Sequence, residues 1–340
     1  MTDIISDINK KVHLWVYLFS WKKMTYFEDI LKARERIAPF IKRTPVISSD
    51  SLNRMFGAEI WFKLENQQKA GAFKFRGATN AVQNLSEEDA RKGVATHSSG
   101  NHAAALALAA KNRGIPAYIV MPENAPEVKV ENVKKFGGHI TFCKPTLQAR
   151  EDTLYEVTAK TGAVFIPPYD CYDVICGQGT AAMELIEEAG PFDILMTPVG
   201  GGGLLSGSAI ATKNISSKTL VIAGEPLEAD DACRSLKAGK IIPSDNPQTI
   251  ADGLKTSLGK LNFEIISQYV DEILTAREHS IRAAMVLLRK QAGILAEPSS
   301  AVPLAAITEN REMFRGKKIG MIISGGNITE TLFRNLTQGF

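Results

Sequence analysis

Cysteine is scarce in this chain, with four residues among 340 and no CxxC pair. A disulfide framework is therefore excluded, and the sequence predicts free thiols in a reducing compartment, the cytoplasm. An excess of charge of one sign is also missing, because 40 Lys and Arg residues face 37 Asp and Glu residues. Without a dense basic block, nucleic acid is not expected as a partner.

Long hydrophobic runs are absent as well. The most apolar segment, residues 12–21, is too short to cross a membrane, because a transmembrane helix needs ~20 apolar residues. Trp-Lys-Lys-Met follows it in place of the small residues of a signal-peptide cleavage site. We expect no membrane partner. Residues 1–23 are expected to form an N-terminal extension of unknown role, either natural or the product of an upstream start codon.

Short apolar runs alternate with helix-length segments along the rest of the chain. Because the runs do not alternate polar and apolar residues, they predict parallel strands buried on both faces of a sheet. The chain is long enough for two domains, and its composition is that of an ordinary globular protein. The sequence thus predicts a doubly wound α/β fold, in which ligands bind beyond the carboxyl ends of the strands. The predicted strands are residues 60–64, 94–96, 117–121, 139–142, 163–166, 194–199, 220–223 and 319–323.

Four consecutive glycines, residues 200–203, separate a predicted strand from a predicted helix at residues 204–212. Their backbone N–H groups are unobstructed by side chains, and a helix N-terminus adds a positive dipole end, which favours a bound phosphate. The loop lacks the GK[ST] ending of a nucleotide P-loop and the GxGxxG spacing of a dinucleotide fold. A tight turn alone would need one glycine, so we favour a phosphate site.

Two other loops and one lysine are ambiguous when taken singly. Residues 96–102, Thr-His-Ser-Ser-Gly-Asn-His, lie between a predicted strand and a helix and suit a small carboxylate, although an ordinary helix cap has the same composition. Residues 324–327 follow the last predicted strand and by themselves indicate only a turn. Lys74 lies between two phenylalanines that would lower its pKa and favour a Schiff base, but for an isolated pattern of this kind a surface lysine is the favoured interpretation.

Taken together, these segments resemble the fold-type II pyridoxal-phosphate enzymes. The resemblance runs from residue 24 to about residue 327 and is greatest to the group of serine racemases, threonine dehydratases and threo-3-hydroxyaspartate dehydratases. It implies a tryptophan synthase β-like fold of two doubly wound domains with mostly parallel sheets. The matching segments, in chain order, are AFKFRGA (72–78), SSGNHA (98–103), GQGT (177–180), GGGGL (200–204), EPLEADD (225–231), ADGLK (251–255) and SGGN (324–327).

The domain boundaries follow from the same resemblance. Residues 24–91 and 169–340 would form the large cofactor-binding domain, and residues 92–168 a small mobile domain that closes over the cleft. Relatives of this kind are usually homodimers, so a homodimer is expected.

The resemblance also assigns the cofactor, pyridoxal 5'-phosphate, to particular residues. Lys74 would carry it as a Schiff base and later remove the substrate's Cα proton. Asn101 would bond to the phenolic oxygen, and Ser324 would face the pyridine nitrogen, where a neutral hydroxyl favours elimination over transamination. The cofactor-binding residues implied are Phe73, Lys74, Asn101, Gly200, Gly201, Gly202, Gly203, Leu204 and Ser324.

Substrate residues are implied in the same way. Ser98, Gly100 and His102 would help bind the α-carboxylate, and Ser99 would exchange a proton at Cα on the face opposite Lys74. Arg150 would pair with a second substrate carboxylate, unless it is a solvent-facing arginine on a helix.

A divalent cation, Mg, Mn or Ca, is implied at Glu225, Asp231 and the Ala229 carbonyl, since hard oxygen ligands suit these ions. A bare acidic turn is the alternative.

We therefore expect β-elimination of a hydroxy amino acid (threonine, serine or threo-3-hydroxyaspartate) to a 2-oxo acid and ammonia. The alternatives are a serine racemase and a catalytically silent ligand-binding homologue.

Overall fold

Two sheets organise the molecule. The computed structural model describes residues 26–340, so the expected extension at residues 1–23 lies outside the described residues. The larger sheet has six strands in the order β1-β2-β10-β7-β8-β9. All of its neighbouring strands are parallel except β1 and β2, which are antiparallel. Its strands are β1 (Val46–Ser48), β2 (Glu59–Leu64), β7 (Ile194–Pro198), β8 (Leu220–Pro226), β9 (Glu272–Ala276) and β10 (Lys318–Ile323).

The smaller sheet has four parallel strands in the order β5-β4-β3-β6. All four lie between residues 94 and 165, inside the range expected for the small domain; the mobility of that domain stays a prediction. The strands are β3 (Val94–His97), β4 (Ala117–Pro122), β5 (His139–Cys143) and β6 (Val164–Phe165).

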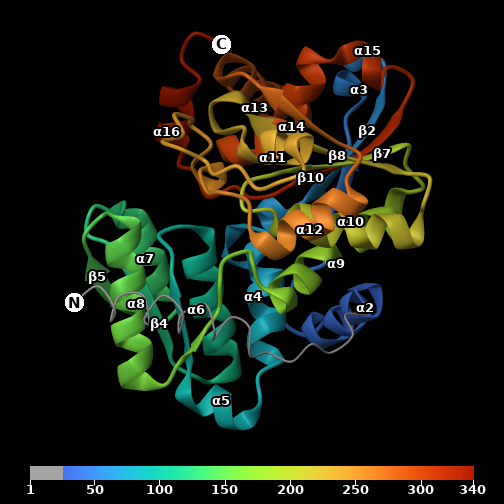
Figure 1. Ribbon diagram of the computed structural model, residues 1–340. Helices are drawn as coiled ribbons and strands as arrows, with labels where there is room; N and C mark the ends of the chain where they lie inside the picture. The colour runs from blue at the N-terminus through green and yellow to red at the C-terminus, as the bar shows by residue number, and fades with distance from the viewer. Residues whose placement is uncertain (1–25) are drawn as a thin grey trace.

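Helices cover both sheets, and each sheet with its helices forms one of two lobes (Figure 1). The first lobe holds the small sheet with α5 (Glu87–Lys92), α6 (Asn101–Arg113), α7 (Glu127–Lys135) and α8 (Leu147–Thr161). The second holds the large sheet with α2 (Tyr26–Ile37), α3 (Asp50–Phe56), α9 (Tyr172–Ala189), α10 (Gly203–Ile215), α11 (Asp231–Ala238), α12 (Lys260–Tyr269), α13 (Glu278–Ala292), α14 (Pro298–Glu309), α15 (Arg311–Phe314) and α16 (Glu330–Leu336).

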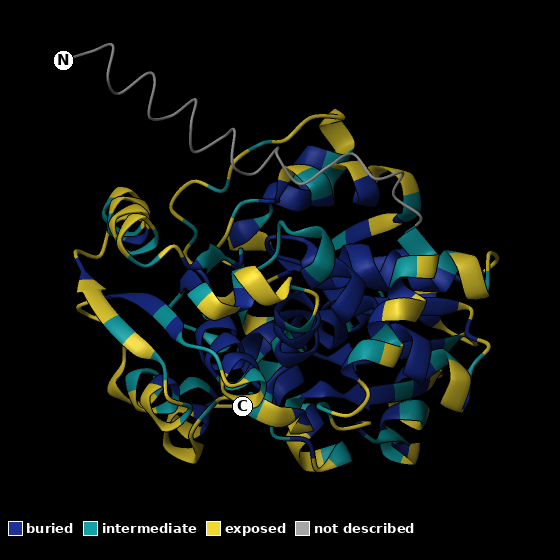
Figure 2. Cartoon of the chain, turned by 90° about the horizontal axis from the view of Figure 1, so that it is seen from below, coloured by how far each residue is buried: buried dark blue, intermediate teal, exposed yellow. Residues whose placement is uncertain are grey.

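One helix, α4 (Lys74–Gln83), joins the two lobes. Its apolar residues Phe75, Ala78 and Val82 belong to the core of the small sheet, together with Leu106 of α6. Its opposite side packs against α9, where a Cβ on Gly177 would lie 2.7 Å from the Arg76 carbonyl oxygen. The glycine of the GQGT segment therefore permits a close helix contact. Buried residues are concentrated at the centre of the molecule (Figure 2).

The predicted α/β fold is confirmed, with three differences in detail. Strands β1 and β9 were not predicted, because β1 has only three residues and β9 mixes polar and apolar residues. Strand β5 was predicted to be buried on both faces, yet most of it is exposed. The reason is its place at the edge of the small sheet, which leaves it with one neighbour. Among the described residues, no helix is long and apolar enough to cross a membrane.

Candidate functional site

Lys74 is the first residue of α4 and lies where the two lobes meet. The chain just before it pairs with the loop after β10, through a bridge between Ala72 and Gly325 and a bond from the Phe73 N–H to the Ser324 carbonyl at 2.9 Å. The Lys74 amine donates to the carbonyl oxygen of Pro168 at 2.7 Å and lies 5.1 Å from the centre of the Phe73 ring. Burial lowers the pKa of this amine to about 8, so it is partly neutral near physiological pH.

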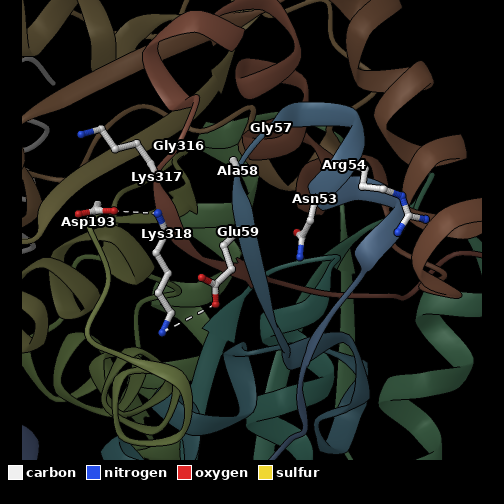
Figure 3. A pocket seen from close by; sticks show the side chains of 9 residues that line it. All are labelled: Asn53, Arg54, Gly57, Ala58, Glu59, Asp193, Gly316, Lys317 and Lys318. Atoms are coloured by element: carbon white, nitrogen blue, oxygen red, sulfur yellow. Dashed lines mark hydrogen bonds and ion pairs between the residues drawn. The ribbon is translucent and has the colours of Figure 1, made fainter.

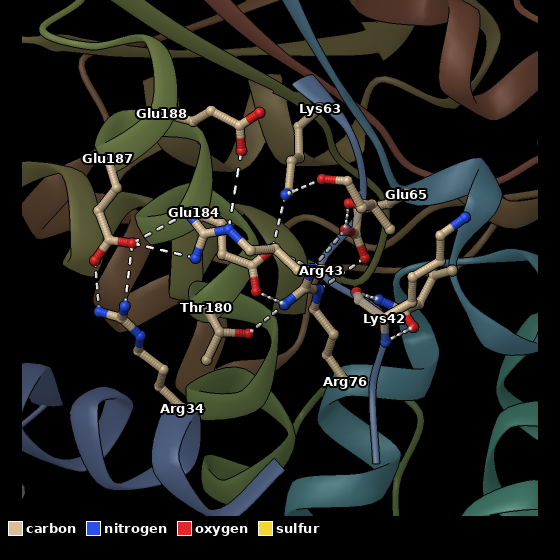
Figure 4. Close-up of polar contacts among 12 residues, drawn as sticks. Arg34, Lys42, Arg43, Lys63, Glu65, Arg76, Thr180, Glu184, Glu187 and Glu188 are labelled. Atoms are coloured by element: carbon tan, nitrogen blue, oxygen red, sulfur yellow. Dashed lines mark hydrogen bonds and ion pairs between the residues drawn. The ribbon is translucent and has the colours of Figure 1, made fainter. Parts of the chain in front are cut away.

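A network of four buried charged side chains joins Arg76 of α4 to neighbouring elements (Figure 4). The Arg76 guanidinium donates twice to Glu65 and twice to Glu184, each time at 2.8 Å. Lys63 completes the network with a bond of 2.7 Å to Glu184. Arg76 and Lys63 are fully buried. Because these groups belong to β2, to the 3-10 turn η1 (Glu65–Gln67) and to α9, they hold the start of α4, and therefore Lys74, against all three elements.

The four-glycine loop joins β7 to α10 and leaves its donors free. No backbone N–H of residues 200–204 has an acceptor within residues 26–340. The carbonyl of Gly201, by contrast, accepts bonds from the Gly259 N–H at 3.1 Å and the Asn262 side chain at 3.0 Å. A Cβ on Gly201 would lie 2.4 Å from the ring of Tyr169. Glycine is therefore required there, and the unpaired N–H groups suit a phosphate.

Ser324 and Asn101 already have partners in the protein. The Ser324 hydroxyl is buried and lies 2.9 Å from the Ser300 hydroxyl. The Asn101 amide donates to Glu297 at 2.9 Å and accepts a bond from Asn327 at 2.9 Å. A pyridoxal phosphate fits the residues present, because a buried amine of lowered pKa and a row of free backbone donors provide for its aldehyde and its phosphate.

The serine loop is partly open. A Cβ on Gly100 would meet no atom within 4 Å, and Ser99 has no hydrogen bond within the described part of the chain. The Ser98 hydroxyl accepts a bond from the Gly100 N–H at 3.3 Å. Space and free polar groups therefore lie beside the N-terminus of α6, as a small carboxylate would need.

His102 is buried and hydrogen-bonds to a backbone carbonyl. Its Nε2 lies 3.0 Å from the Ile166 carbonyl, and burial lowers the pKa of the imidazole to about 3. The neutral ring therefore donates from Nε2, and its buried Nδ1, which has no partner among the described residues, is an acceptor. In this orientation the side chain has no N–H left for a carboxylate, and its predicted role stays a prediction.

Arg150 lies in α8, at the edge of the same region. It is partly buried, and its guanidinium makes one weak bond, from Nε to the Thr146 carbonyl at 3.4 Å. No carboxylate of the described residues pairs with it. Burial is the main cause that lowers the pKa of His97 to about 4, and the positive charge of Arg150 is the second cause. Arg150 is thus a cation without an acidic partner among the described residues.

The acidic residues expected to hold a cation are close to helix α11. Both oxygens of Glu225 accept backbone bonds, from Ala232 at 2.9 Å and Cys233 at 2.8 Å. One oxygen of Asp231 accepts from Leu258 at 2.9 Å, whereas the other is buried and unpaired within residues 26–340. Among the described residues, no group of three or more His, Cys, Asp or Glu side chains is placed so that it could hold a metal ion. Any cation here would therefore rely on carbonyl oxygens and water as well.

A hollow of about 530 Å³ lies at the other end of the large sheet (Figure 3). It is bordered by Arg54, Glu59, Asp193, Lys317 and Lys318, at the amino ends of β2 and β10. Ligands of parallel α/β sheets bind at the carboxyl ends. The position of Lys74 and the glycine loop, rather than this open hollow, therefore marks the candidate active site.

Sequence reasoning missed two groups at the site, Glu297 and Asp170. Glu297 precedes α14 and contacts Asn101, and Asp170 accepts backbone bonds from Lys260 and Leu261 at 3.0 Å each. Neither lies in a local pattern that indicates a site, because the partners are distant in the sequence.

Comparison with known proteins agrees with this geometry. The chain is 51% identical over 302 residues to the beta-hydroxyaspartate dehydratase of Paracoccus denitrificans (strain Pd 1222), covering 89% of this chain and 96% of that protein. It is 48% identical over 313 residues to the serine racemase of Arabidopsis thaliana, covering 89% and 94%. The crystal structure of serine racemase from Dictyostelium discoideum matches with a TM-score of 0.86 and 46% identity, covering 89% of this chain and 98% of that one. Residues 37–325 match the pyridoxal-phosphate dependent enzymes, and the chain belongs to that family.

Proposed function

We propose that the protein is an ammonia-lyase that eliminates water from a hydroxy amino acid; hydrolysis of the resulting enamine then takes up one water and yields a 2-oxo acid and ammonia. Threo-3-hydroxyaspartate is our first candidate substrate, ahead of serine and threonine. The observation that carries this choice is the Arg150 guanidinium, which is partly buried and free of any carboxylate among the described residues. A planar guanidinium binds a carboxylate through two parallel hydrogen bonds, and hydroxyaspartate has a second carboxylate to offer.

The chain's own residues supply proton transfer and orientation. Bound pyridoxal phosphate draws electrons from the bonds at the substrate's Cα. The amine of Lys74, with its pKa lowered to about 8 by burial, holds or releases a proton near neutral pH. We assign the cofactor phosphate to the N–H groups of Gly200, Gly201, Gly202, Gly203 and Leu204, the ring to Phe73, and the pyridine nitrogen to Ser324. The α-carboxylate would lie at Ser98, Gly100 and the N-terminus of α6.

Serine racemisation is the second candidate function, and Ser99 favours it. Racemisation needs a proton carrier on each face of Cα, and the Ser99 hydroxyl has no competing partner within the described residues. A protein that uses Lys74 and Ser99 in turn would interconvert L- and D-serine. A ligand-binding homologue without catalysis is the third possibility that the experiments must separate.

A substrate panel on the purified holoenzyme tests these functions. Oxo acid, ammonia and amino-acid chirality are measured after incubation with threo-3-hydroxyaspartate, serine and threonine. We expect oxo acid to form fastest from hydroxyaspartate and Lys74→Ala to abolish it. D-serine accumulating faster than pyruvate would make racemisation the main activity. A protein that binds the cofactor but transforms none of these amino acids would be a silent homologue.

Substitution of Arg150 tests the substrate choice. Loss of a charged hydrogen-bonding pair costs about 1.5–3 kcal/mol, so Arg150→Met should lower kcat/KM for hydroxyaspartate roughly 10- to 150-fold. Serine turnover should change less than about threefold. Lys160→Met, which removes an exposed cation from the same helix, is the matched control. Equal losses on serine and hydroxyaspartate would contradict the assignment.

We also propose a structural divalent cation (Mg, Mn or Ca) beside Glu225, Asp231 and the Ala229 carbonyl, and a homodimer in the cytoplasm. The unpaired buried oxygen of Asp231 supports the cation. Chelation should then lower the Tm and a divalent ion should restore it, whereas Asp231→Asn should remove that dependence. A Tm that does not change on addition of a chelator would refute the cation. A monomer in analytical ultracentrifugation would refute the dimer.

A further inference from the structure

Glu297 is a buried carboxylate without a cation partner. It precedes α14 and is 7% exposed, and no Lys, Arg or His of the described residues forms an ion pair with it. A buried unpaired charge is costly, so its surroundings must be arranged to accept it. Burial raises the pKa of this carboxyl to about 7. The charged groups that act on it are Asp252, Lys129 and the amine of Lys74.

The main partner of Glu297 is the Asn101 side chain. The Asn101 amide nitrogen lies 2.9 and 3.2 Å from the two carboxylate oxygens. On its other side, the Asn101 oxygen accepts a bond from the Asn327 amide at 2.9 Å, and Asn327 also donates to the Ala70 carbonyl at 2.9 Å. The Asn101 amide is thus held between an acceptor and a donor.

This arrangement fixes which way the Asn101 amide faces. The Asn101 nitrogen lies within hydrogen-bond distance of both Glu297 oxygens, which accept its hydrogens when the carboxylate is ionised. The Asn327 nitrogen donates to a backbone carbonyl as well, so it must face the amide oxygen. A flipped Asn101 would set oxygen against oxygen and nitrogen against nitrogen. An amide nitrogen carries two hydrogens, and the bond to Glu297 leaves one of them for another acceptor.

Glu297 also contacts the loop that carries Ser324. Its N–H donates to the Gly325 carbonyl at 3.2 Å, and a Cβ on Gly325 would lie 2.6 Å from a Glu297 carboxylate oxygen. Its charge counteracts the effect of burial on the pKa of Lys74. The Glu297 carboxylate therefore lies beside the Lys74 amine, the loop after β10 and Asn101.

We propose that Glu297 is a positioning residue that orients Asn101, so that the free amide hydrogen faces the phenolic oxygen of the Lys74-bound cofactor. The proposal rests on the cofactor role that we propose for Asn101. A fixed donor at that oxygen stabilises its ionised form and so sets the colour of the resting enzyme. Glu297 itself acts through Asn101 and transfers no proton.

The test measures the resting holoenzyme without substrate. Glu297→Gln keeps the shape but replaces the obligate acceptor with an amide that can donate. We expect the balance between the visible and near-ultraviolet cofactor bands to shift, with a change of at least half a unit in its pH midpoint. Cofactor affinity should fall about 2- to 13-fold, the effect of one hydrogen bond. The matched control is Glu330→Gln, which removes an exposed carboxylate that pairs with Arg289 and should leave both readouts unchanged.

Asn101→Ala separates positioning from a direct charge effect. If Glu297 acts through Asn101, adding Glu297→Gln to Asn101→Ala should change the spectrum no further. A full additional shift in the double variant would overturn the proposal, as would a folded Glu297→Gln protein with the wild-type spectrum and pH midpoint. Should Glu297→Gln not fold, Glu297→Asp replaces it, and a wild-type spectrum there would equally refute the proposal. A wild-type protein that binds no cofactor would instead refute the proposed function.

Discussion

Loss of the buried charge network around Arg76 should change the free energy of unfolding by an amount large enough to measure. Arg76 and Lys63 supply two positive charges, and Glu65 and Glu184 supply two negative ones, all at or near zero exposure. Arg76→Met leaves Glu65 buried with no cation. Removing one partner of a buried pair typically costs about 3–5 kcal/mol, a large part of the ~5–15 kcal/mol that keeps a protein folded.

Urea unfolding of the protein, followed by circular dichroism and tryptophan fluorescence, measures this loss. We expect Arg76→Met to lose ~3–5 kcal/mol, and addition of Glu65→Gln to recover most of it, because the second change removes the orphaned charge. The matched control is Arg34→Met. Arg34 pairs with Glu187 at the surface, with side chains 40% and 35% exposed, and should cost about 0–1 kcal/mol. A loss below ~1 kcal/mol for Arg76→Met, or no recovery in the double variant, would refute the reasoning.

Three further outcomes follow from the site. Gly201→Ala places a methyl group 2.4 Å from the Tyr169 ring, so cofactor affinity measured by equilibrium dialysis should fall at least about tenfold; unchanged affinity would show that the loop does not hold the phosphate. The rate of cofactor uptake by the apoenzyme should rise with pH to a midpoint near 8, because burial lowers the pKa of Lys74 to about 8 and only the neutral amine reacts; a midpoint above ~9.5 would indicate an ordinary exposed lysine. Asp170→Ala should destabilise the protein by about 0.5–2 kcal/mol in thermal unfolding, through loss of the bonds to the N-terminus of α12, whereas Asp170→Asn should retain most of the stability.

The strands at the centre of each sheet could be predicted, because burial on both faces leaves a continuous apolar run. All five residues of β7 are buried, and the run at residues 194–199 predicted this strand closely. Edge strands gave weaker patterns. β5 is exposed because it is an edge strand whose one neighbour is β4. The order of strands in a sheet depends on contacts between distant parts of the chain, so a local pattern does not reveal which strand is at the edge.

The candidate site was predictable where consecutive residues form it, as in the glycine loop and the segment around Lys74. The polar partners were not. Glu297 and Asn327 lie 196 and 226 residues from Asn101, so no local spacing relates them. The orientation of His102 likewise depends on the Ile166 carbonyl, which lies 64 residues away in the sequence and reaches the ring only in the folded small sheet. Family membership was identified correctly, whereas the residue roles stay predictions.

The position of β10 constrains how a newly made chain reaches its active form. This strand, near the C-terminal end, pairs with β2 on one side and β7 on the other, inside the large sheet. The small sheet, by contrast, draws on one continuous stretch of sequence. During synthesis the small sheet can therefore assemble on the ribosome, while the large sheet must wait until residues 318–323 have left the exit tunnel. For most of its synthesis the nascent chain therefore contains Lys74 without the loop after β10, which pairs with the residues just before α4 in the folded protein.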